Sequence, residues 1–213
     1  MAAEYRIAVL ASGAGTNLQA LIDAIASGHL QAKLVGVFSD KPACLALRRA
    51  RDAGIPATAL SPADFASRAA FDAAFFAAVD AAKPDLIVCA GYMRLISPEA
   101  ADARSDRTIN LHPSLLPAFK GLRTHQQALE AGAHEHGASL HAVTADLDGG
   151  PVIAQARVPV LPGDDAERLA ARVREREHPL LVDTVRGFAE GRLTLHDGRV
   201  YLNGEPLRAP LQL

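Results

Sequence analysis

The chain has 213 residues, of which 49% are hydrophobic and 22% are charged, and its formal net charge is −2. This composition excludes a disordered chain, and the near balance of 22 basic and 24 acidic residues leaves no excess charge to drive binding to nucleic acid or an anionic membrane. No apolar run approaches the roughly 20 residues of a membrane span. The two cysteines, Cys44 and Cys89, lack a CxxC spacing. The sequence therefore predicts a soluble, cytoplasmic, globular protein, with residues 1–213 as a single domain.

The first hundred residues alternate between strand-like and helix-like segments. Short apolar runs predict strands over residues 6–11, 33–39, 57–60 and 85–90. Amphipathic or alanine-rich runs predict helices over residues 18–27, 43–53 and 64–82. Because parallel strands are joined through crossover helices, this alternation predicts an α/β fold with a doubly wound, mostly parallel sheet and a Rossmann-like N-terminal half.

The second half has a different pattern, with strands predicted over residues 107–112, 139–144 and 151–160 and a helix over 124–131. A long helix is predicted over residues 164–190, with Asp164 as its N-cap and Glu167 in the capping-box position. Pro179 is expected to kink or split this helix. Two short strands, 193–195 and 200–202, are expected to form a closing hairpin around Asp197-Gly198.

A glycine-containing turn, residues 12–17, separates the first predicted strand from the first helix. Backbone N–H groups at such a turn can approach an anion, and the helix N-terminus adds partial positive charge. Leu18 stands where GxGxxG has its third glycine, and the Walker pattern is absent, so a single phosphate fits better than a dinucleotide or a triphosphate. Thr16 and Asn17 would be additional donors. A tight turn without any ligand explains the same glycines equally well.

Asn110 and His112 are two residues apart on a predicted strand and so share one face. A carboxamide donor beside an imidazole is suited to stabilising a developing oxyanion. An isolated pair of this kind is, however, more often a core Asn and His that bond to backbone groups.

Asp148 precedes two glycines in a loop between two predicted strands. Such a carboxylate can support an imidazolium or accept protons through water, although an ordinary acidic turn has the same composition. If Asp148 lies near His112, its charge is expected to raise the pKa of the imidazole.

Three further patterns are weaker indications of a functional site. His134-Glu135-His136 lacks a third ligand and is expected to be a surface turn, so no metal is predicted. The charged run of residues 174–178 is expected to be a solvated helix face. Met93-Arg94 follows a strand end, where open α/β sheets bind ligands.

Taken in this order, these segments resemble the phosphoribosylglycinamide formyltransferases of purine biosynthesis. The resemblance covers nearly the whole chain, from Ile7 to about Leu202, and its most specific parts are SGAGTNLQAL, AGYMR, INLHPSLLP, GLRTHQQALEAG, HGASLHAVTADLDGGPVIAQ and REREH. INLHPSLLP followed by DGGP is also typical of the wider formyltetrahydrofolate-using group. The first glycine turn and GLRTH favour the ribonucleotide enzyme within that group.

The resemblance implies transfer of a formyl group from the co-substrate 10-formyltetrahydrofolate to the amino group of glycinamide ribonucleotide, with no metal. It implies a mixed sheet in the C-terminal half, with residues 1–100 binding the ribonucleotide phosphate and residues 101–213 carrying catalysis and folate binding. It also implies a monomer or homodimer, with no nucleic-acid or membrane partner.

Three sets of site residues follow from the resemblance. The implied catalytic residues are Asn110, His112 and Asp148. The implied ribonucleotide-binding residues are Gly15, Thr16, Asn17 and Glu177. The implied folate-binding residues are Arg68, Met93, Arg94, Leu95, Ile96 and Asn110.

The residues themselves, without the resemblance, are also compatible with two other functions. In a formyltetrahydrofolate hydrolase, water replaces the attacking amine and formate is released without ribonucleotide. A catalytically inert module that binds folate or a phosphorylated metabolite would have no need of Asn110, His112 and Asp148 together.

Overall fold

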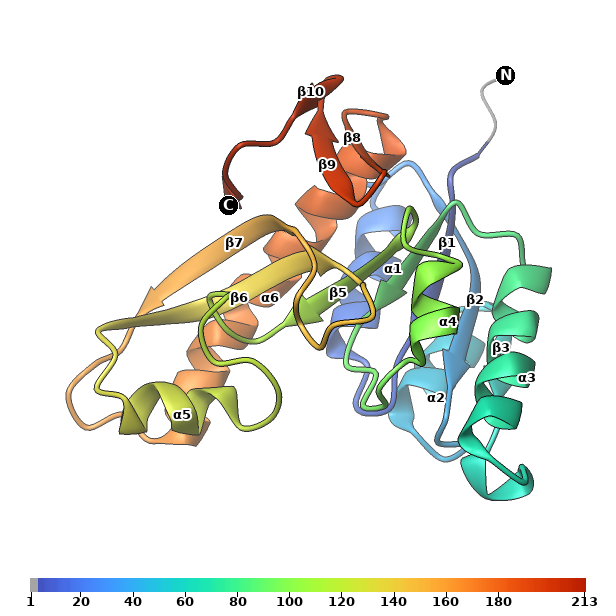
Figure 1. The fold of residues 1–213 in the computed structure, drawn as a ribbon, viewed down its shortest axis with the longest axis horizontal. Helices are drawn as coiled ribbons and strands as arrows, with labels where there is room; N and C mark the ends of the chain where they lie inside the picture. Colours follow the sequence, from blue (N-terminus) through green and yellow to red (C-terminus); the bar gives the residue numbers. More distant parts are fainter. Residues whose placement is uncertain (1–3) are drawn as a thin grey trace.

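A computed structural model describes residues 4–213, in which an eight-stranded sheet and a three-stranded sheet are flanked by helices (Figure 1). The strands of the large sheet, in spatial order, are β11 (Leu211–Gln212), β7 (Val152–Pro159), β6 (Glu135–Ala142), β5 (Thr108–His112), β4 (Leu86–Cys89), β1 (Arg6–Leu10), β2 (Lys33–Ser39) and β3 (Ala57–Ala59). The strands of the small sheet are β10 (Glu205–Pro206), β9 (Arg199–Leu202) and β8 (Leu193–His196).

The helices are α1 (Thr16–Ala26), α2 (Leu45–Asp52), α3 (Arg68–Ala81), α4 (Pro98–Asp102), α5 (Thr124–Glu130) and α6 (Ala166–Ala189), with a 3₁₀ turn η1 (Pro62–Asp64). Helix α4 was not predicted, because five residues are too few to show a helical period. Its start is nevertheless well marked, since the Ser97 side chain accepts from the Ala100 N–H and Pro98 occupies the first helical position. None of the helices within residues 4–213 is long and apolar enough to cross a membrane.

The large sheet is parallel from β3 to β5 and mixed beyond it. Strands β3, β2, β1, β4 and β5 pair in parallel, whereas β6 is antiparallel to both β5 and β7. The chain therefore moves outward from β1 through β2 and β3, and then resumes on the other side of β1 with β4 and β5. The point at which the strand order reverses, the switch point, therefore lies between β1 and β4. Open α/β sheets bind their ligands at the carboxyl ends of the strands that flank such a point.

Helices cover both faces of the sheet, and β1 illustrates how its sequence is divided between them. Ile7 and Val9 face the larger apolar cluster, which includes residues of α1, α2 and α6. Ala8 and Leu10 face a second cluster built around the phenylalanines of α3. Burial on both faces explains why the strand is continuously apolar rather than alternating.

The start of α6 differs from the prediction. Asp165, rather than Asp164, is the N-cap, and its carboxylate accepts from the Arg168 N–H at 2.8 Å. Glu167 is consequently the second helical residue and not in the capping-box position. Asp164 instead accepts from the Leu161 N–H at 2.8 Å and pairs with Arg172 at 2.6 Å. Two adjacent aspartates cannot be ranked as caps from sequence alone, because the arginine that pairs with one of them lies two turns away.

Pro179 does not split α6, which continues through it to Ala189. Proline removes one backbone N–H and therefore one helical bond. The residues that follow, including Leu180 and Leu181, are buried against the sheet, and this packing holds the helix together on both sides of the proline. The closing hairpin is confirmed, since Asp197 and Gly198 between β8 and β9 have φ values of 53° and 67°, as a type I′ turn requires.

Candidate active site

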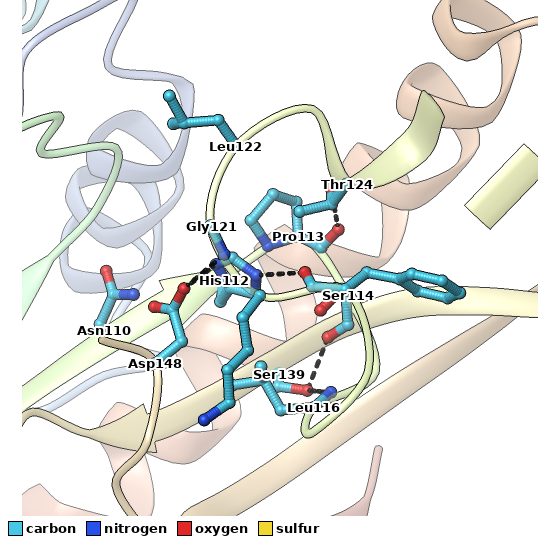
Figure 2. Close-up of polar contacts among 12 residues, drawn as sticks. Asn110, His112, Pro113, Ser114, Leu116, Gly121, Leu122, Thr124, Ser139 and Asp148 are labelled. Carbon is cyan, nitrogen blue, oxygen red and sulfur yellow. Dashed lines mark hydrogen bonds and ion pairs between the residues drawn. The ribbon is translucent and has the colours of Figure 1, made fainter. Parts of the chain in front are cut away.

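The predicted catalytic residues come from two segments that the sheet topology brings together. Asn110 and His112 lie on β5, and Asp148 lies in the loop between β6 and β7. Figure 2 shows Asp148 between the side chains of Asn110 and His112. Strand β5 is parallel to β4 and pairs Asn110 with Cys89, so these side chains lie at the carboxyl edge near the switch point.

His112 lies between two acceptors. Its Nδ1 is 3.5 Å from Asp148 Oδ2, and its Nε2 is 3.0 Å from the Phe119 carbonyl oxygen. The Asp148 oxygen also accepts from the Gly121 N–H at 2.9 Å (Figure 2). Because a carbonyl can only accept, the ring proton of neutral His112 is assigned to Nε2, which leaves the Nδ1 lone pair facing Asp148. The predicted proximity of Asp148 to His112 is confirmed.

The Asp148 loop has an unusual backbone path, as the two following glycines suggested. Asp148 itself has a φ of 46°, in the left-handed region that favours glycine. A Cβ on Gly150 would lie 2.0 Å from the Ala142 carbonyl oxygen, so no side chain fits there. The glycine thus lets the loop lie against β6, and in this conformation the Asp148 carboxylate lies 3.5 Å from both His112 Nδ1 and His141 Nε2.

His141 is part of this cluster and was not singled out from the sequence. Its Nε2 is 3.0 Å from Asn110 Nδ2 and 3.5 Å from Asp148 Oδ1, and its Nδ1 is 2.9 Å from the Ala142 carbonyl. The Ala142 carbonyl assigns the proton to Nδ1, so Nε2 accepts from the Asn110 amide. Asn110 and His141 are register partners on antiparallel strands. Only this register places His141 beside Asn110, and the register is known only once β5 is paired with β6.

The Asp148 charge does act to raise the pKa of His112, as predicted, but the expected net rise above the ordinary value is wrong. Burial of the ring lowers the pKa below its ordinary value, and this effect outweighs the opposing influence of the Phe119 carbonyl and the Asp148 charge. For Asp148 the balance is reversed. Burial alone would raise its pKa, but the neighbouring His141 ring and the hydrogen bond from the Gly121 N–H lower it. At neutral pH the site therefore holds a neutral imidazole beside an ionised carboxylate.

The segment after His112 is held by a buried hydrogen-bond network. Ser139 on β6 donates from Oγ to the Ser114 carbonyl at 2.7 Å and accepts from the Leu116 N–H at 3.0 Å (Figure 2). Gln155 on β7 donates to the Leu116 carbonyl and to Ser139 Oγ, both at 2.9 Å. These bonds fix the path that carries the Phe119 carbonyl back to His112.

The glycine turn and α6 meet at the predicted ribonucleotide-binding residues. Gly15 is the N-cap of α1, and Thr16 and Asn17 are its first two residues. Asn17 Nδ2 donates to Glu177 Oε2 at 3.1 Å, which joins the turn to α6. The Asn17 Oδ1 atom is buried without a hydrogen-bond partner. The structure thus brings together residues that are 160 positions apart in the chain.

Replacing Gly15 with alanine is expected to lower the free energy of unfolding by roughly 1–3 kcal/mol. Gly15 has a φ of 71°, and a Cβ there would lie 2.7 Å from the Ala46 Cα of α2. Gly13→Ala is the matched control, because a Cβ at that position meets no atom within 4 Å. Urea denaturation of both variants measures the difference. Equal stabilities would contradict the close packing of the turn against α2.

Four of the predicted folate-binding residues, 93–96, lie in the loop after β4, whereas Arg68 begins α3 and Asn110 lies on β5. Arg68 Nη2 on α3 donates to the Leu95 carbonyl at 2.7 Å, and the Arg94 guanidinium lies 4.7 Å from the Phe71 ring centroid. Met93 and Leu95 are 62% and 56% exposed, which leaves two large apolar side chains open to a ligand. Ile96 packs against the α3 cluster. The loop begins next to the strand position that pairs with Asn110.

His136 is not in a surface turn, as the sequence suggested, but lies within β6 and is fully buried. Its Nε2 is 3.0 Å from His125 Nδ1 on α5. Burial lowers the pKa of His136 to about 4. The prediction failed because β6 begins at Glu135, so that the residues expected to form a turn are already part of the sheet. Within residues 4–213 no group of three or more metal-ligating side chains is found.

His136 is expected to make the protein less stable as the pH falls from 6.5 toward 4. Its pKa is near 6.5 when unfolded and about 4 when folded, so the unfolded chain binds the proton first. The loss is up to roughly 3 kcal/mol across this window and is absent above pH 6.5. Thermal denaturation against pH measures it. His136→Phe should flatten the dependence, and an unchanged slope in that variant would contradict this assignment.

Comparison with known proteins shows the family to which this chain belongs. Residues 5–185 match the family model described as formyl transferase. The chain belongs to the formyl transferase family. It is 46% identical over 201 residues to the phosphoribosylglycinamide formyltransferase of Escherichia coli K12, a match that covers 94% of this chain and 95% of that relative. The resemblance drawn from the motifs is therefore confirmed.

Solved structures of a phosphoribosylglycinamide formyltransferase and of a formyltetrahydrofolate deformylase agree with the fold. The phosphoribosylglycinamide formyltransferase of Coxiella burnetii has a TM-score of 0.94 and 42% identity, and the match covers 99% of this chain and 100% of that one. The formyltetrahydrofolate deformylase of Burkholderia mallei has a TM-score of 0.83 and 31% identity, covering 94% of this chain and 70% of that one. The predicted fold class, mostly parallel with a mixed C-terminal half, is confirmed.

Proposed function

We propose that this formyl transferase moves the formyl group of 10-formyltetrahydrofolate to the amino group of glycinamide ribonucleotide, in purine biosynthesis. The products are formylglycinamide ribonucleotide and tetrahydrofolate. The observation that carries this proposal is the cluster of Asn110, His112 and Asp148 at the carboxyl edge of the sheet, close to the switch point. The similarity to named phosphoribosylglycinamide formyltransferases supports the choice of substrates.

The reaction begins when the amine attacks the formyl carbon. The new C–N bond converts the carbonyl into an oxyanion and the amine into an ammonium. Asn110 Nδ2 carries two hydrogens, of which His141 Nε2 accepts one, so the other is left to donate to the oxyanion. His141 is a positioning residue in this step, because its hydrogen bond to Nδ2 fixes the orientation of the Asn110 amide so that the nitrogen, and not the oxygen, faces the oxyanion.

The ammonium must then lose a proton before the intermediate collapses. The Asp148 carboxylate and the Nδ1 lone pair of His112 form an acceptor pair for this proton. Protonation of His112 Nδ1 gives an imidazolium between Asp148 and the Phe119 carbonyl, two acceptors that support it. Return of the proton, through water, to the leaving folate nitrogen accompanies cleavage of its bond to the formyl carbon. These steps use only protein groups and solvent.

The two substrates are assigned to neighbouring parts of the carboxyl edge of the large sheet. Gly15, Thr16, Asn17 and Glu177 would bind the ribonucleotide, with the phosphate at the N-terminus of α1. The loop of Met93, Arg94, Leu95 and Ile96, with Arg68 and Asn110, would bind the folate. In this assignment residues 1–100 supply the phosphate site and residues 101–213 supply catalysis, while the folate site takes Arg68 and residues 93–96 from the first part and Asn110 from the second. A cytoplasmic location and a monomer or homodimer remain predictions from the sequence.

One assay distinguishes the proposed function from its alternatives. The purified protein is mixed with glycinamide ribonucleotide and 10-formyltetrahydrofolate, and the absorbance of the deformylated folate is followed while the products are identified by mass spectrometry. Formylglycinamide ribonucleotide formed in equal amount to tetrahydrofolate is the expected result. Formate released without ribonucleotide would indicate a hydrolase, as the structural similarity to a deformylase requires us to test. Binding without turnover would indicate an inert module.

Arg68→Ala is expected to raise the folate KM by no more than about fivefold and to leave kcat nearly unchanged. The Arg68 side chain is about half exposed, and interactions of exposed charged groups are typically worth ~0–1 kcal/mol. Steady-state rates at varied folate concentration measure the effect, with the similarly exposed Arg157→Ala on β7 as control. A large loss of kcat at unchanged folate KM would contradict a folate-binding role for Arg68.

A further inference from the structure

Ser12 is a buried serine at the end of β1 that forms hydrogen bonds to two other segments. Its N–H donates to the Gly91 carbonyl at 2.9 Å, and its Oγ accepts from the Met93 N–H at 3.0 Å. The same Oγ donates to Asp40 Oδ1 at 2.5 Å. Gly91 and Met93 follow β4, and Asp40 follows β2, so Ser12 joins the carboxyl ends of three neighbouring strands.

We propose that Ser12 is a positioning residue that holds residues 93–96 in the conformation that binds the folate, and that Asp40 keeps the Ser12 hydroxyl aimed for this purpose. A hydroxyl has a single proton. When that proton is donated to Asp40, a lone pair of Oγ is directed to the Met93 N–H. Asp40 and Ser12 are only 7% and 4% exposed, and a charge-assisted bond between buried groups is well suited to fixing a rotamer. This inference rests on the proposed function.

Side chains anchor the folate-side loop unevenly, since Arg94 lies over the Phe71 ring and Ile96 packs against the α3 cluster, whereas Met93 at its start does not anchor it. Met93 and Leu95 are mostly exposed, so packing does not determine where the loop begins. Farther along, Arg68 binds the Leu95 carbonyl, and the Ser97 N–H donates to Asp72 Oδ2 at 3.2 Å. Ser12 supplies the corresponding bonds at the start of the loop.

The rest of the glycine turn, residues 13–17, is held by hydrogen bonds that do not involve the Ser12 hydroxyl. The Ala46 N–H donates to the Gly13 carbonyl at 3.1 Å, and Arg49 Nε donates to the Ala14 carbonyl at 2.9 Å. The first bond of α1 runs from the Gln19 N–H to the Gly15 carbonyl at 3.0 Å. Loss of the Ser12 hydroxyl should therefore disturb the folate side far more than the ribonucleotide side, although Ser12 adjoins the ribonucleotide turn in sequence.

Ser12→Ala tests this asymmetry. We expect the Kd for tetrahydrofolate, measured by calorimetry, and the folate KM to rise about tenfold, the effect of losing about one hydrogen bond. The ribonucleotide KM should stay within about twofold and kcat within about threefold of the wild-type values, since neither the turn nor the catalytic cluster uses this hydroxyl. Ser27→Ala, which removes an exposed hydroxyl at the far end of α1, is the matched control and should change none of these constants.

Variants of Asp40 test the same bond from its other side. Asp40→Ala leaves the hydroxyl free to rotate and should raise the folate Kd and KM, whereas Asp40→Asn keeps an acceptor oxygen and should restore most of the affinity. If Ser12→Ala has a low melting temperature, the Asp40 variants still test whether the bond between Asp40 and Ser12 positions the folate-binding loop. A merely structural role would raise both substrate KM values together, or would lower the melting temperature without changing either.

The outcomes separate this inference from the proposed function. If the wild type does not transfer formyl groups but binds tetrahydrofolate, and Ser12→Ala weakens that binding, the function fails and the positioning role stands. If the wild type transfers formyl groups and Ser12→Ala changes the folate Kd and KM by less than about twofold, the positioning role is overturned and the function stands. Equal increases in both substrate KM values, or no folate binding by the wild type, also overturn it.

Discussion

Asp148→Asn is expected to lower kcat by about 10³-fold, within the range that a positioned acid–base group contributes, while both substrate KM values stay nearly unchanged. The carboxylate lies 3.5 Å from both His112 Nδ1 and His141 Nε2, and it accepts from the Gly121 N–H. An amide of almost the same volume cannot accept the ammonium proton or support an imidazolium at His112. Because the loop is held by Gly150 and β6, the substitution should leave the fold intact.

Asp146→Asn is the matched control, since Asp146 is an exposed aspartate two residues earlier in the same loop. Initial rates at saturating concentrations of both substrates measure kcat, and thermal denaturation verifies folding. A kcat of Asp148→Asn close to that of Asp146→Asn would refute the role proposed for Asp148, even though membership of the formyl transferase family would be unaffected.

Asn110→Leu is expected to lower kcat by about 10²- to 10³-fold, the usual cost of losing one oxyanion donor. Leucine has a similar size and no hydrogen to donate. The substitution also leaves His141 Nε2 without the Asn110 amide, so a moderate loss of stability should accompany the loss of rate. The ribonucleotide KM should change little, because Asn17 and Glu177 lie on other elements.

Two measurements separate these effects at Asn110. His141→Phe, which removes the amide's partner but keeps the donor, should lower kcat less than Asn110→Leu does while costing similar stability. Single-turnover rates report formyl transfer without product release. If Asn110→Leu retains a near-normal single-turnover rate, the oxyanion is stabilised by another group and the role of Asn110 in the proposed mechanism is wrong.

The sequence was sufficient to predict the features that depend only on residues close together in the chain. The apolar run of β1, followed by Gly15 and the start of α1, is a strand–turn–helix unit whose order follows from hydrophobic periodicity and from one backbone position with positive φ. The two-residue spacing of Asn110 and His112 places both on one face of a strand wherever that strand lies. The type I′ turn at Asp197-Gly198 is likewise specified by its own two residues.

Only the tertiary structure decided which side chains meet and how strongly water is excluded from them. His141 joins Asn110 and Asp148 because β5 and β6 pair in one particular register. The pKa of His112 is lowered, and not raised, because burial outweighs a nearby carboxylate. The hydrogen bond from the Met93 N–H to Ser12 Oγ exists because parallel strands end at the same edge of the sheet. Pairing register, burial and strand order depend on contacts between residues that are distant in sequence, so no short motif contains them.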